Sequence, residues 1–504
     1  MRRRTTAGLA AALSLVLAVS GCTVGVDNPW PDPTPGDSAH PVTWENCRRA
    51  TSETRSLPTS MTVECGKIRV PQDWASPDDG KTFDIALMRI YTGELYDKRG
   101  SIITNPGGPG GSGLDFLPSL VTDVEGLLDD FALVSFDPRG VGQSDAIDCI
   151  SDKDLDETFG ADPDPRTQSD FDAEVAVAQR IADACQDKYG DQLRLFSTVQ
   201  TARDLDAIRA AVGDEKLTYL GFSYGTLLGS VYAQLFPTHV RAMVLDGAVD
   251  PALSPTQLAE GQAMGFDRAL AHFTAWCQQS PSRCPIAADP MGAINAALER
   301  GRTDPITGPD GRKANAGWIL WGVTVALYNQ ASWDYLGPAI DKLNKGDASE
   351  ILRGADAYAE RDRNGHYSSL ISANIAINCA DADYPEPSEI RQLQQEWRTK
   401  YPTFGAALAI GMLNCSVWRS AIDPLPAGPA EGAPPILVIG TTGDPATPYE
   451  NTQKLADTIT VGHVITWEGE GHTAYPNTSC IRRAVERYLI REILPEEGLR
   501  CPAR

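Results

Sequence analysis

The stretch LTYLGFSYGTLLGSVYAQLF, residues 217–236, decides the fold of this chain. Its start, Leu217–Leu220, is a short and mainly apolar run that predicts a buried strand, and Tyr224–Phe236 predicts a helix. Between them lies a G-x-S-x-G pattern centred on Ser223. Glycines on both sides of a serine permit a tight strand-to-helix turn that lifts the hydroxyl clear of the sheet. We therefore expect Ser223 to be a catalytic nucleophile.

A serine hydroxyl is a weak nucleophile unless a neighbouring base removes its proton. In the nucleophile-elbow hydrolases that this strand-turn-helix pattern resembles, the order along the chain is serine, acid, histidine. His472 fits this order, because it lies in a glycine-containing loop directly after a predicted strand at residues 463–467. The other histidines precede the elbow, or fall at a turn, in a helical region or at the start of a strand: His40, His239, His272, His366 and His463. The sequence predicts His472 as the base.

The triad acid should follow the strand before the last one. Residues 436–440 predict that strand, and they lead into Thr441-Thr442-Gly443-Asp444-Pro445. A buried carboxylate at this point would orient the imidazole and stabilise its charged form. Asp444 is the expected acid. Asp457 is a distant second choice because it falls inside a predicted helix.

A glycine-rich loop follows another predicted strand, Ser101–Thr104. It reads Asn105-Pro106-Gly107-Gly108-Pro109-Gly110-Gly111-Ser112-Gly113. Glycines let the main chain approach a substrate closely, and a carbonyl oxygen that gains negative charge needs backbone N–H donors. We expect the oxyanion donors to be the N–H groups of Gly108 and Tyr224. The loop lacks the Lys-Ser/Thr ending of a nucleotide-binding P-loop.

Strands and helices alternate up to about residue 250. Strands are predicted at 83–91, 101–104, 131–136, 217–220 and 240–245, and helices at 198–212 and 224–236. This alternation is typical of a mostly parallel sheet with helices on both faces. Residues 251–434 then give mainly helix signals before the strands at 436–440 and 463–467. We expect an α/β core, residues 42–250 and 435–504, with an inserted helical cap, residues 251–434.

The N-terminus has the pattern of an export signal. Three arginines at positions 2–4 precede an apolar stretch, Leu9–Val19, which is too short to span a bilayer. The stretch ends in Val19-Ser20-Gly21-Cys22, which resembles a bacterial lipobox. Residues 1–21 are predicted as a lipoprotein signal peptide, with lipidation at Cys22 and a proline-rich tether at 22–41. The protein would be anchored to the outer face of the cell membrane or, if Cys22 is incidental, secreted.

The net charge of −23 argues against nucleic acid as a partner, because phosphate backbones repel an acidic protein. Apart from Cys22 there are ten cysteines, and an exported protein meets an oxidising compartment. Pairing of sequence neighbours predicts five disulfides: Cys47–Cys65, Cys149–Cys185, Cys277–Cys284, Cys379–Cys415 and Cys480–Cys501. No His/Cys cluster has metal-ligand spacing, and we expect neither a metal nor a cofactor.

Taken together, these motifs resemble the prolyl-aminopeptidase branch of the α/β-hydrolases. The chain is most similar to the secreted tripeptidyl aminopeptidases of actinomycetes and to mycobacterial cell-envelope serine hydrolases, and the resemblance includes the late segment with Asp444 and His472. It rests on the set and order of the glycine loop, Asp137–Ser144, the elbow, Gly443-Asp444 and Gly471-His472. Prolyl aminopeptidases typically carry histidine where this chain has Pro106. That departure fits the tripeptidyl group better.

The resemblance implies an α/β-hydrolase fold and the release of short peptides from free N-termini through an acyl-enzyme. Two other functions stay open: a carboxylesterase or lipase of the cell envelope, and a catalytically silent envelope-binding protein. The expected partner is a peptide with a free N-terminus or an ester, and the membrane is contacted only through the lipid anchor. Carboxylates that could hold the substrate ammonium are Asp250, Glu260, Asp381 and Asp383.

Overall fold

The computed structural model describes residues 42–503. The predicted signal peptide, Cys22 and the tether all fall outside the described residues. Within residues 42–503, no helix combines the length and the apolar character needed to cross a membrane.

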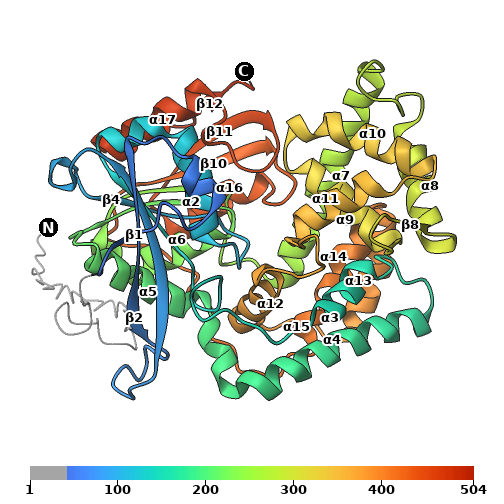
Figure 1. The fold of residues 1–504 in the computed structure, drawn as a ribbon, viewed down its shortest axis with the longest axis horizontal. Helices are drawn as coiled ribbons and strands as arrows, with labels where there is room; N and C mark the ends of the chain where they lie inside the picture. The colour runs from blue at the N-terminus through green and yellow to red at the C-terminus, as the bar shows by residue number, and fades with distance from the viewer. Residues whose placement is uncertain (1–41, 504) are drawn as a thin grey trace, which may run out of the picture. The chain divides into compact units, whose positions relative to one another are not determined.

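A mostly parallel ten-stranded sheet runs through the described part of the chain (Figure 1). Its strand order is β1-β2-β3-β5-β4-β6-β7-β10-β11-β12. Pairing is antiparallel from β1 to β5 and parallel from β5 to β12. Every strand predicted from the sequence is present. The strands are β1 (Glu45–Asn46), β2 (Met61–Pro71), β3 (Thr82–Thr92), β4 (Ser101–Asn105), β5 (Ala132–Phe136), β6 (Leu217–Phe222), β7 (Val240–Asp246), β10 (Ile436–Gly443), β11 (Gly462–Glu470) and β12 (Arg500–Cys501).

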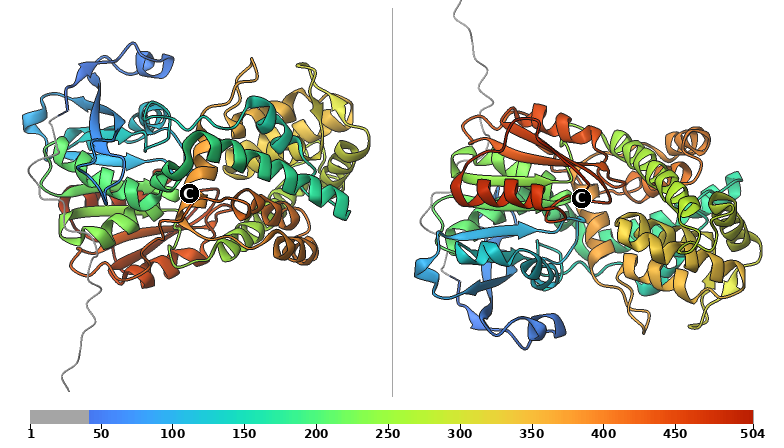
Figure 2. Two further views of the ribbon diagram at one scale, coloured as in Figure 1. Left: turned by 90° about the horizontal axis from the view of Figure 1, so that it is seen from below. Right: turned by 90° about the horizontal axis from the view of Figure 1, so that it is seen from above.

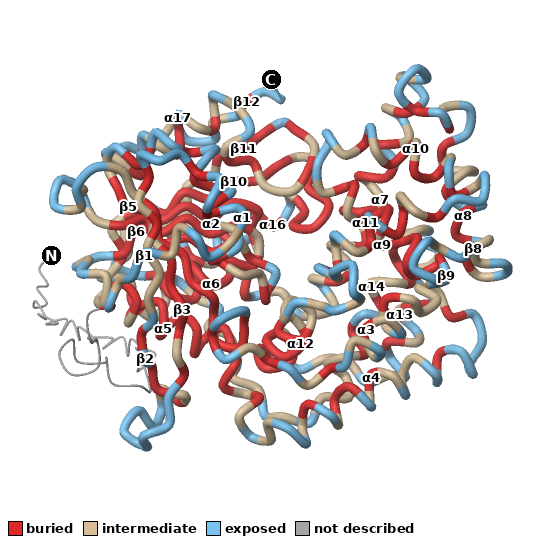
Figure 3. Tube along the Cα trace, in the orientation of Figure 1, coloured by how far each residue is buried: buried red, intermediate tan, exposed pale blue. Residues whose placement is uncertain are grey.

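Helices cover both faces of this sheet, as predicted. One apolar cluster joins the sheet to α5 (Thr198–Ala211), α6 (Tyr224–Leu235) and α16 (Glu450–Ile459). A second cluster, on the other face, contains α2 (Gly113–Asp123) and α17 (Ser479–Arg491). The central strands are buried throughout (Figure 3), because a parallel strand between two helical layers has no face left for water.

The five predicted disulfides are confirmed within residues 42–503. Two of them join separate helices or strands. Cys480–Cys501 joins α17 to β12 at the end of the sheet, and Cys379–Cys415 joins two helices of the inserted region.

Between β7 and β10 the chain is mainly helical and has its own apolar core, around Phe273, Trp318 and Ile351. The predicted helix start at Ser254-Pro255 is confirmed, because the side chain of Ser254 caps a helix whose first residue is Pro255. We call these helices the cap: α7 (Pro255–Gln279), α8 (Pro290–Thr303), α9 (Ala316–Leu327), α10 (Trp333–Asn344), α11 (Ser349–Ala359), α12 (Leu370–Asp381), α13 (Pro387–Lys400), α14 (Gly405–Gly411) and α15 (Leu413–Ser416). A short hairpin is inserted in it: β8 (Ile306–Thr307) and β9 (Lys313–Ala314).

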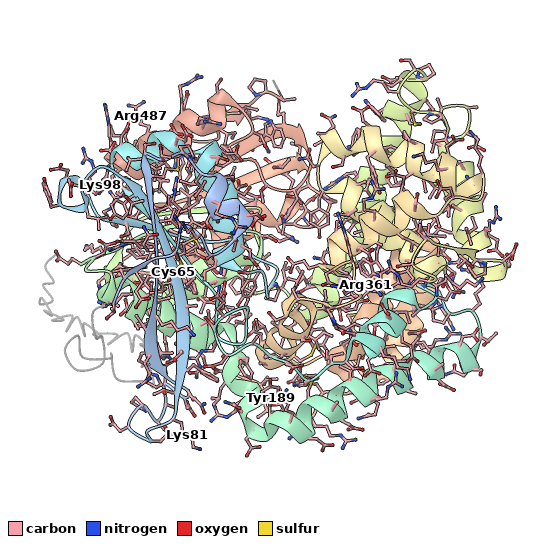
Figure 4. All side chains as sticks on the ribbon, in the orientation of Figure 1. Cys65, Lys81, Lys98, Tyr189, Arg361 and Arg487 are labelled. Atoms are coloured by element: carbon pink, nitrogen blue, oxygen red, sulfur yellow. A yellow bond between two sulfur atoms is a disulfide. The ribbon has the colours of Figure 1, made fainter. Side chains whose placement is uncertain are left out.

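Two earlier helices, α3 (Asp152–Gly160) and α4 (Gln168–Tyr189), pack among the cap helices rather than on the sheet (Figure 2). The division made from the sequence assigned these residues to the core. Phe159 of α3 stacks on Trp318 of α9, with ring centroids 5.5 Å apart. Arg361, labelled in Figure 4, pairs with the carboxylate of Asp156 in α3 at 2.9 Å. Helical segments on both sides of the elbow therefore build the cap.

Candidate active site

Ser223 is the single residue that links β6 to α6. Its backbone has φ 55° and ψ −124°, a conformation that few non-glycine residues adopt. Both flanking glycines are required by close packing. A Cβ at position 221 would lie 2.4 Å from the carbonyl oxygen of Gly225, and one at position 225 would lie 2.7 Å from that of Asn105. The turn therefore holds Ser223 half-buried at the carboxyl end of the strand, as the G-x-S-x-G pattern predicts.

Asp444 and His472 are directly hydrogen-bonded. The Nδ1 atom of His472 lies 2.9 and 3.0 Å from the two carboxylate oxygens. Asp444 is fully buried and also accepts the N–H groups of Ala446, Thr447 and Thr473 at 2.9, 2.9 and 3.1 Å, and the Thr447 hydroxyl at 3.0 Å. These donors compensate the burial of a charged carboxylate. The acid is thus held rigidly and the imidazole is oriented by it.

Burial alone would lower the pKa of His472, but the charge and the hydrogen bond of Asp444 outweigh it, so the pKa of His472 lies above its ordinary value. Because Nδ1 faces Asp444, Nε2 is the ring nitrogen that remains free to exchange a proton with substrate groups.

Ser223, Asp444 and His472 follow the carboxyl ends of β6, β10 and β11, which lie close together in one parallel part of the sheet. Strand ends of this kind share one edge of the sheet, where ligands bind in open α/β folds. Within residues 42–503 the hydrogen bonds join the acid to the base but do not join the base to Ser223 Oγ. Catalytic hydrogen bonds are often long before substrate binds.

The glycine loop packs directly against the elbow. A Cβ on Gly107, whose φ is +99°, would lie 2.9 Å from Ser223 Cβ and 3.0 Å from the backbone nitrogen of Tyr224. The N–H of Gly107 is already donated to the side chain of Asn105 at 3.0 Å. The next N–H, that of Gly108, donates to no acceptor among the described residues. This geometry suits the predicted pair of donors, Gly108 and Tyr224.

The Asp137-Pro138-Arg139-Gly140 segment supports the glycine loop instead of lining the site. Asp137 accepts the hydroxyl of Ser112 at 2.7 Å and the N–H of Leu114 at 3.2 Å, so it fixes the start of α2 at the end of that loop. Arg139 forms a fully buried ion pair with Asp204 of α5 at 2.5 Å. The motif is therefore structural.

The cap contacts the loop that carries the base. Tyr328, which follows α9, accepts the N–H of His472 at 2.8 Å, and its ring meets the imidazole edge-on with centroids 5.3 Å apart. The next residue, Asn329, forms a β-bridge with Gly471. Gly471 must lack a side chain, because a Cβ there would lie 2.8 Å from the carbonyl oxygen of Tyr328.

Three residues near the triad were not predicted: Thr447, Tyr328 and Asp246. Thr447 had a local signal, since it follows Asp444 by three residues. Asp246 also had one, since it directly follows the strand predicted at 240–245. Tyr328 had none, because it lies 144 residues before His472 in the sequence and meets it only in the folded chain.

Three of the four carboxylates considered for the substrate ammonium already accept hydrogen bonds within the protein. Asp381 is buried and accepts the N–H and the hydroxyl of Thr198 at 2.7 and 2.6 Å. Glu260 accepts a lysine of α13 at 2.6 Å. Asp250 is buried and accepts the N–H two residues further on, at 3.1 Å. Asp383 is exposed. Within residues 42–503, no group of three or more His, Cys, Asp or Glu side chains could hold a metal ion.

Several known proteins are similar to this chain in sequence. Residues 100–477 match the family described as alpha/beta hydrolase fold. Serine protease Hip1 of Mycobacterium tuberculosis is 36% identical over 526 residues, covering 98% of this chain and 96% of the relative. Carboxylesterase B of the same species is 35% identical, covering 97% and 95%. Tripeptidyl aminopeptidase of Streptomyces lividans is 31% identical, covering 89% and 84%. With the elbow, the acid–base pair and the mixed sheet in place, the chain belongs to the α/β-hydrolase family.

Proposed function

We propose that this protein is a serine hydrolase that releases short peptides from free N-termini through an acyl-enzyme. The observation that carries the proposal is the hydrogen-bonded Asp444–His472 pair, set at the same sheet edge as the elbow serine. The relatives named serine protease and tripeptidyl aminopeptidase support a peptidase.

In the proposed mechanism Ser223 Oγ attacks the carbonyl carbon of the scissile bond while His472 Nε2 takes its proton. The imidazolium that forms is stabilised by Asp444 and passes the proton to the leaving amine. The N–H groups of Gly108 and Tyr224 bind the oxyanion. Water then attacks the acyl-enzyme by the same proton route, and the acyl product leaves Ser223 free.

The cap supports an exopeptidase over an endopeptidase. Its helices contact the loops around the site: Gln262 of α7 donates to the carbonyl of Ala446 at 3.2 Å, and Asn374 of α12 donates to that of Pro109 at 3.1 Å. A cap held over the site in this way would exclude a folded protein chain and admit the free end of a peptide. Excluding water there would also strengthen the oxyanion donors.

We expect unblocked tripeptide amides to be cleaved at least tenfold faster, in kcat/KM, than their N-acetylated versions. A charge-assisted contact to the ammonium contributes about 1.5–3 kcal/mol, which acetylation would remove. Casein should hardly be cleaved. Equal rates on blocked and unblocked peptides would refute recognition of the substrate ammonium. Efficient internal cleavage of casein would refute the proposal that the cap excludes protein chains.

The second candidate is a carboxylesterase, which the relative named carboxylesterase B favours. The same triad cleaves esters, so assays on matched peptide amides and aryl esters, with a serine-directed covalent inhibitor, separate the two. A catalytically silent envelope-binding protein would turn over neither class and would not react with the inhibitor.

The location that we propose is the outer face of the cell membrane, through a lipid on Cys22. Its support is the lipobox-like sequence alone. Cys22→Ser should move the protein from the membrane fraction to the soluble exported fraction, in cell fractionation with immunodetection. One acyl chain binds only marginally, so more than one is expected on the anchored form. Unchanged partitioning of the variant would show that Cys22 is not the anchor.

A further inference from the structure

A second carboxylate, Asp246, lies beside the triad without belonging to it. It is the last residue of β7, between the strand that leads to Ser223 and the strand that leads to Asp444. Its side chain is fully buried. Within residues 42–503 it forms no ion pair with a lysine or arginine, unlike the buried Asp204.

Asp246 binds the backbone that follows the base. The N–H of Ala474 lies 3.0 Å from both carboxylate oxygens, and the N–H of Tyr475 lies 2.7 Å from one of them. The preceding N–H, that of Thr473, goes to Asp444. Three consecutive N–H groups after His472 are thus divided between two carboxylates from neighbouring strands.

The same residue also binds the elbow. The carbonyl oxygen of Asp246 accepts the N–H of Ser223 at 2.9 Å. Thr226, in the first turn of α6, extends this link by donating to the carbonyls of Ser223 and Gly247 at 2.6 and 3.3 Å. Asp246 therefore connects the segment of the nucleophile to the segment of the base, which lie about 250 residues apart in the sequence.

The hydrogen bonds that the Asp246 side chain accepts do not by themselves require it to carry a negative charge. A neutral amide oxygen could accept the N–H groups of Ala474 and Tyr475, and it would avoid the cost of burying a carboxylate without a cation. The titratable groups that act on Asp246 are Asp444 and His472. A negative charge at this place would favour the imidazolium that forms during proton transfer.

We propose that Asp246 is a positioning residue of the catalytic site, which holds the His472 loop on the elbow and, when it is ionised, adds a second negative charge near the imidazole. This inference rests on the proposed function. Burial raises the pKa of Asp246 to about 7, in spite of the N–H donors of Tyr475 and Ala474, which lower it. The charge of Asp246 in turn raises the pKa of His472, together with the larger contribution of Asp444.

The test is Asp246→Asn, with kcat/KM for an unblocked tripeptide chromogenic amide measured from pH 4 to 9. Turnover requires a neutral His472, so it falls on the acid side of the profile. Removing the charge should lower the pKa of His472 and move the acid limb down by roughly half to one pH unit. Because Asp246 is ionised only above about pH 7, the gain in relative activity of the variant should be largest near that pH and should vanish towards about pH 5, where Asp246 is protonated in the wild type as well.

Asp214→Asn is the matched control. Asp214 is also a carboxylate that accepts a backbone N–H, that of Ser101 at 2.9 Å, but it lies near the start of β4, at the opposite edge of the sheet. Its variant should keep the wild-type acid limb. If Asp246→Asn does not fold by circular dichroism, Asp246→Ser supplies a neutral acceptor for the same measurement.

An acid limb that coincides with that of the wild type in a folded Asp246 variant would overturn the inference. Failure of the proposed function would give a different result from failure of this inference. In that case the wild-type enzyme would show no turnover that depends on Ser223, and no labelling by a fluorophosphonate inhibitor, whatever stands at position 246.

Discussion

Ser223→Ala is expected to reduce kcat by about 10⁴- to 10⁶-fold, the range found when a triad nucleophile is removed. The reason is chemical, because alanine has no oxygen to form the acyl-enzyme. Its methyl group is smaller than the serine side chain, and it fits the strained backbone of the elbow no worse than serine does. The measurement is initial rates on an unblocked tripeptide amide and an aryl ester, with unfolding temperature as the check of the fold.

The control for this variant is Ser230→Ala in the same helix. Ser230 is buried on α6 and its hydroxyl donates to the carbonyl of Leu227 at 2.8 Å, away from the catalytic loops. Its removal should change stability slightly and leave kcat unaltered. If Ser223→Ala kept activity within about tenfold of the wild type, Ser223 would not be the nucleophile.

Asp444→Asn is expected to lower kcat by about 10⁴-fold, as replacement of the triad acid does elsewhere. Asparagine has one acceptor oxygen where Asp444 has two. The carboxylate here faces five donors: three N–H groups, the Thr447 hydroxyl and the Nδ1–H of His472. An amide must turn its NH₂ group towards one part of this set. It would favour the wrong tautomer of His472, with Nδ1 unprotonated and Nε2 unable to accept the serine proton.

Asp457→Asn is the matched control because Asp457 was the second choice for the acid. The structure places it on α16, exposed and hydrogen-bonded to the side chain of Gln453 at 2.8 Å. The two variants should be assayed with the same peptide and ester substrates. Near-wild-type turnover for Asp444→Asn together with a large loss for Asp457→Asn would reverse the assignment.

The parts of the fold that were predictable have a local cause. The strands β6 and β10 are short apolar runs bounded by glycine or a turn, and α7 begins at a serine followed by proline. The start of the cap could be predicted for the same reason, because the alternation of strands and helices gives way there to mainly helical spacing of apolar residues. Strand β2, which lies second in the sheet between β1 and β3, was not predicted, because its burial depends on its pairing with the whole of β3.

The candidate site also has parts that local sequence predicts and parts that depend on tertiary contacts. The sequence by itself determined the elbow serine, the candidate acid and base that follow two later strands, the glycine loop and five pairs of neighbouring cysteines. Each depends on residue types within a few positions, and on the rule that parallel strands end at one edge of a sheet.

Only the tertiary structure decided which residues surround the acid and the base. Tyr328 comes to His472 from the cap, Asp246 joins the His472 loop to the elbow, and α3 and α4 cross over to the cap. The physical reason is that each contact joins segments from over 100 to about 250 residues apart in the sequence. Such contacts are fixed by how helices and strands pack, and they leave no pattern within either segment.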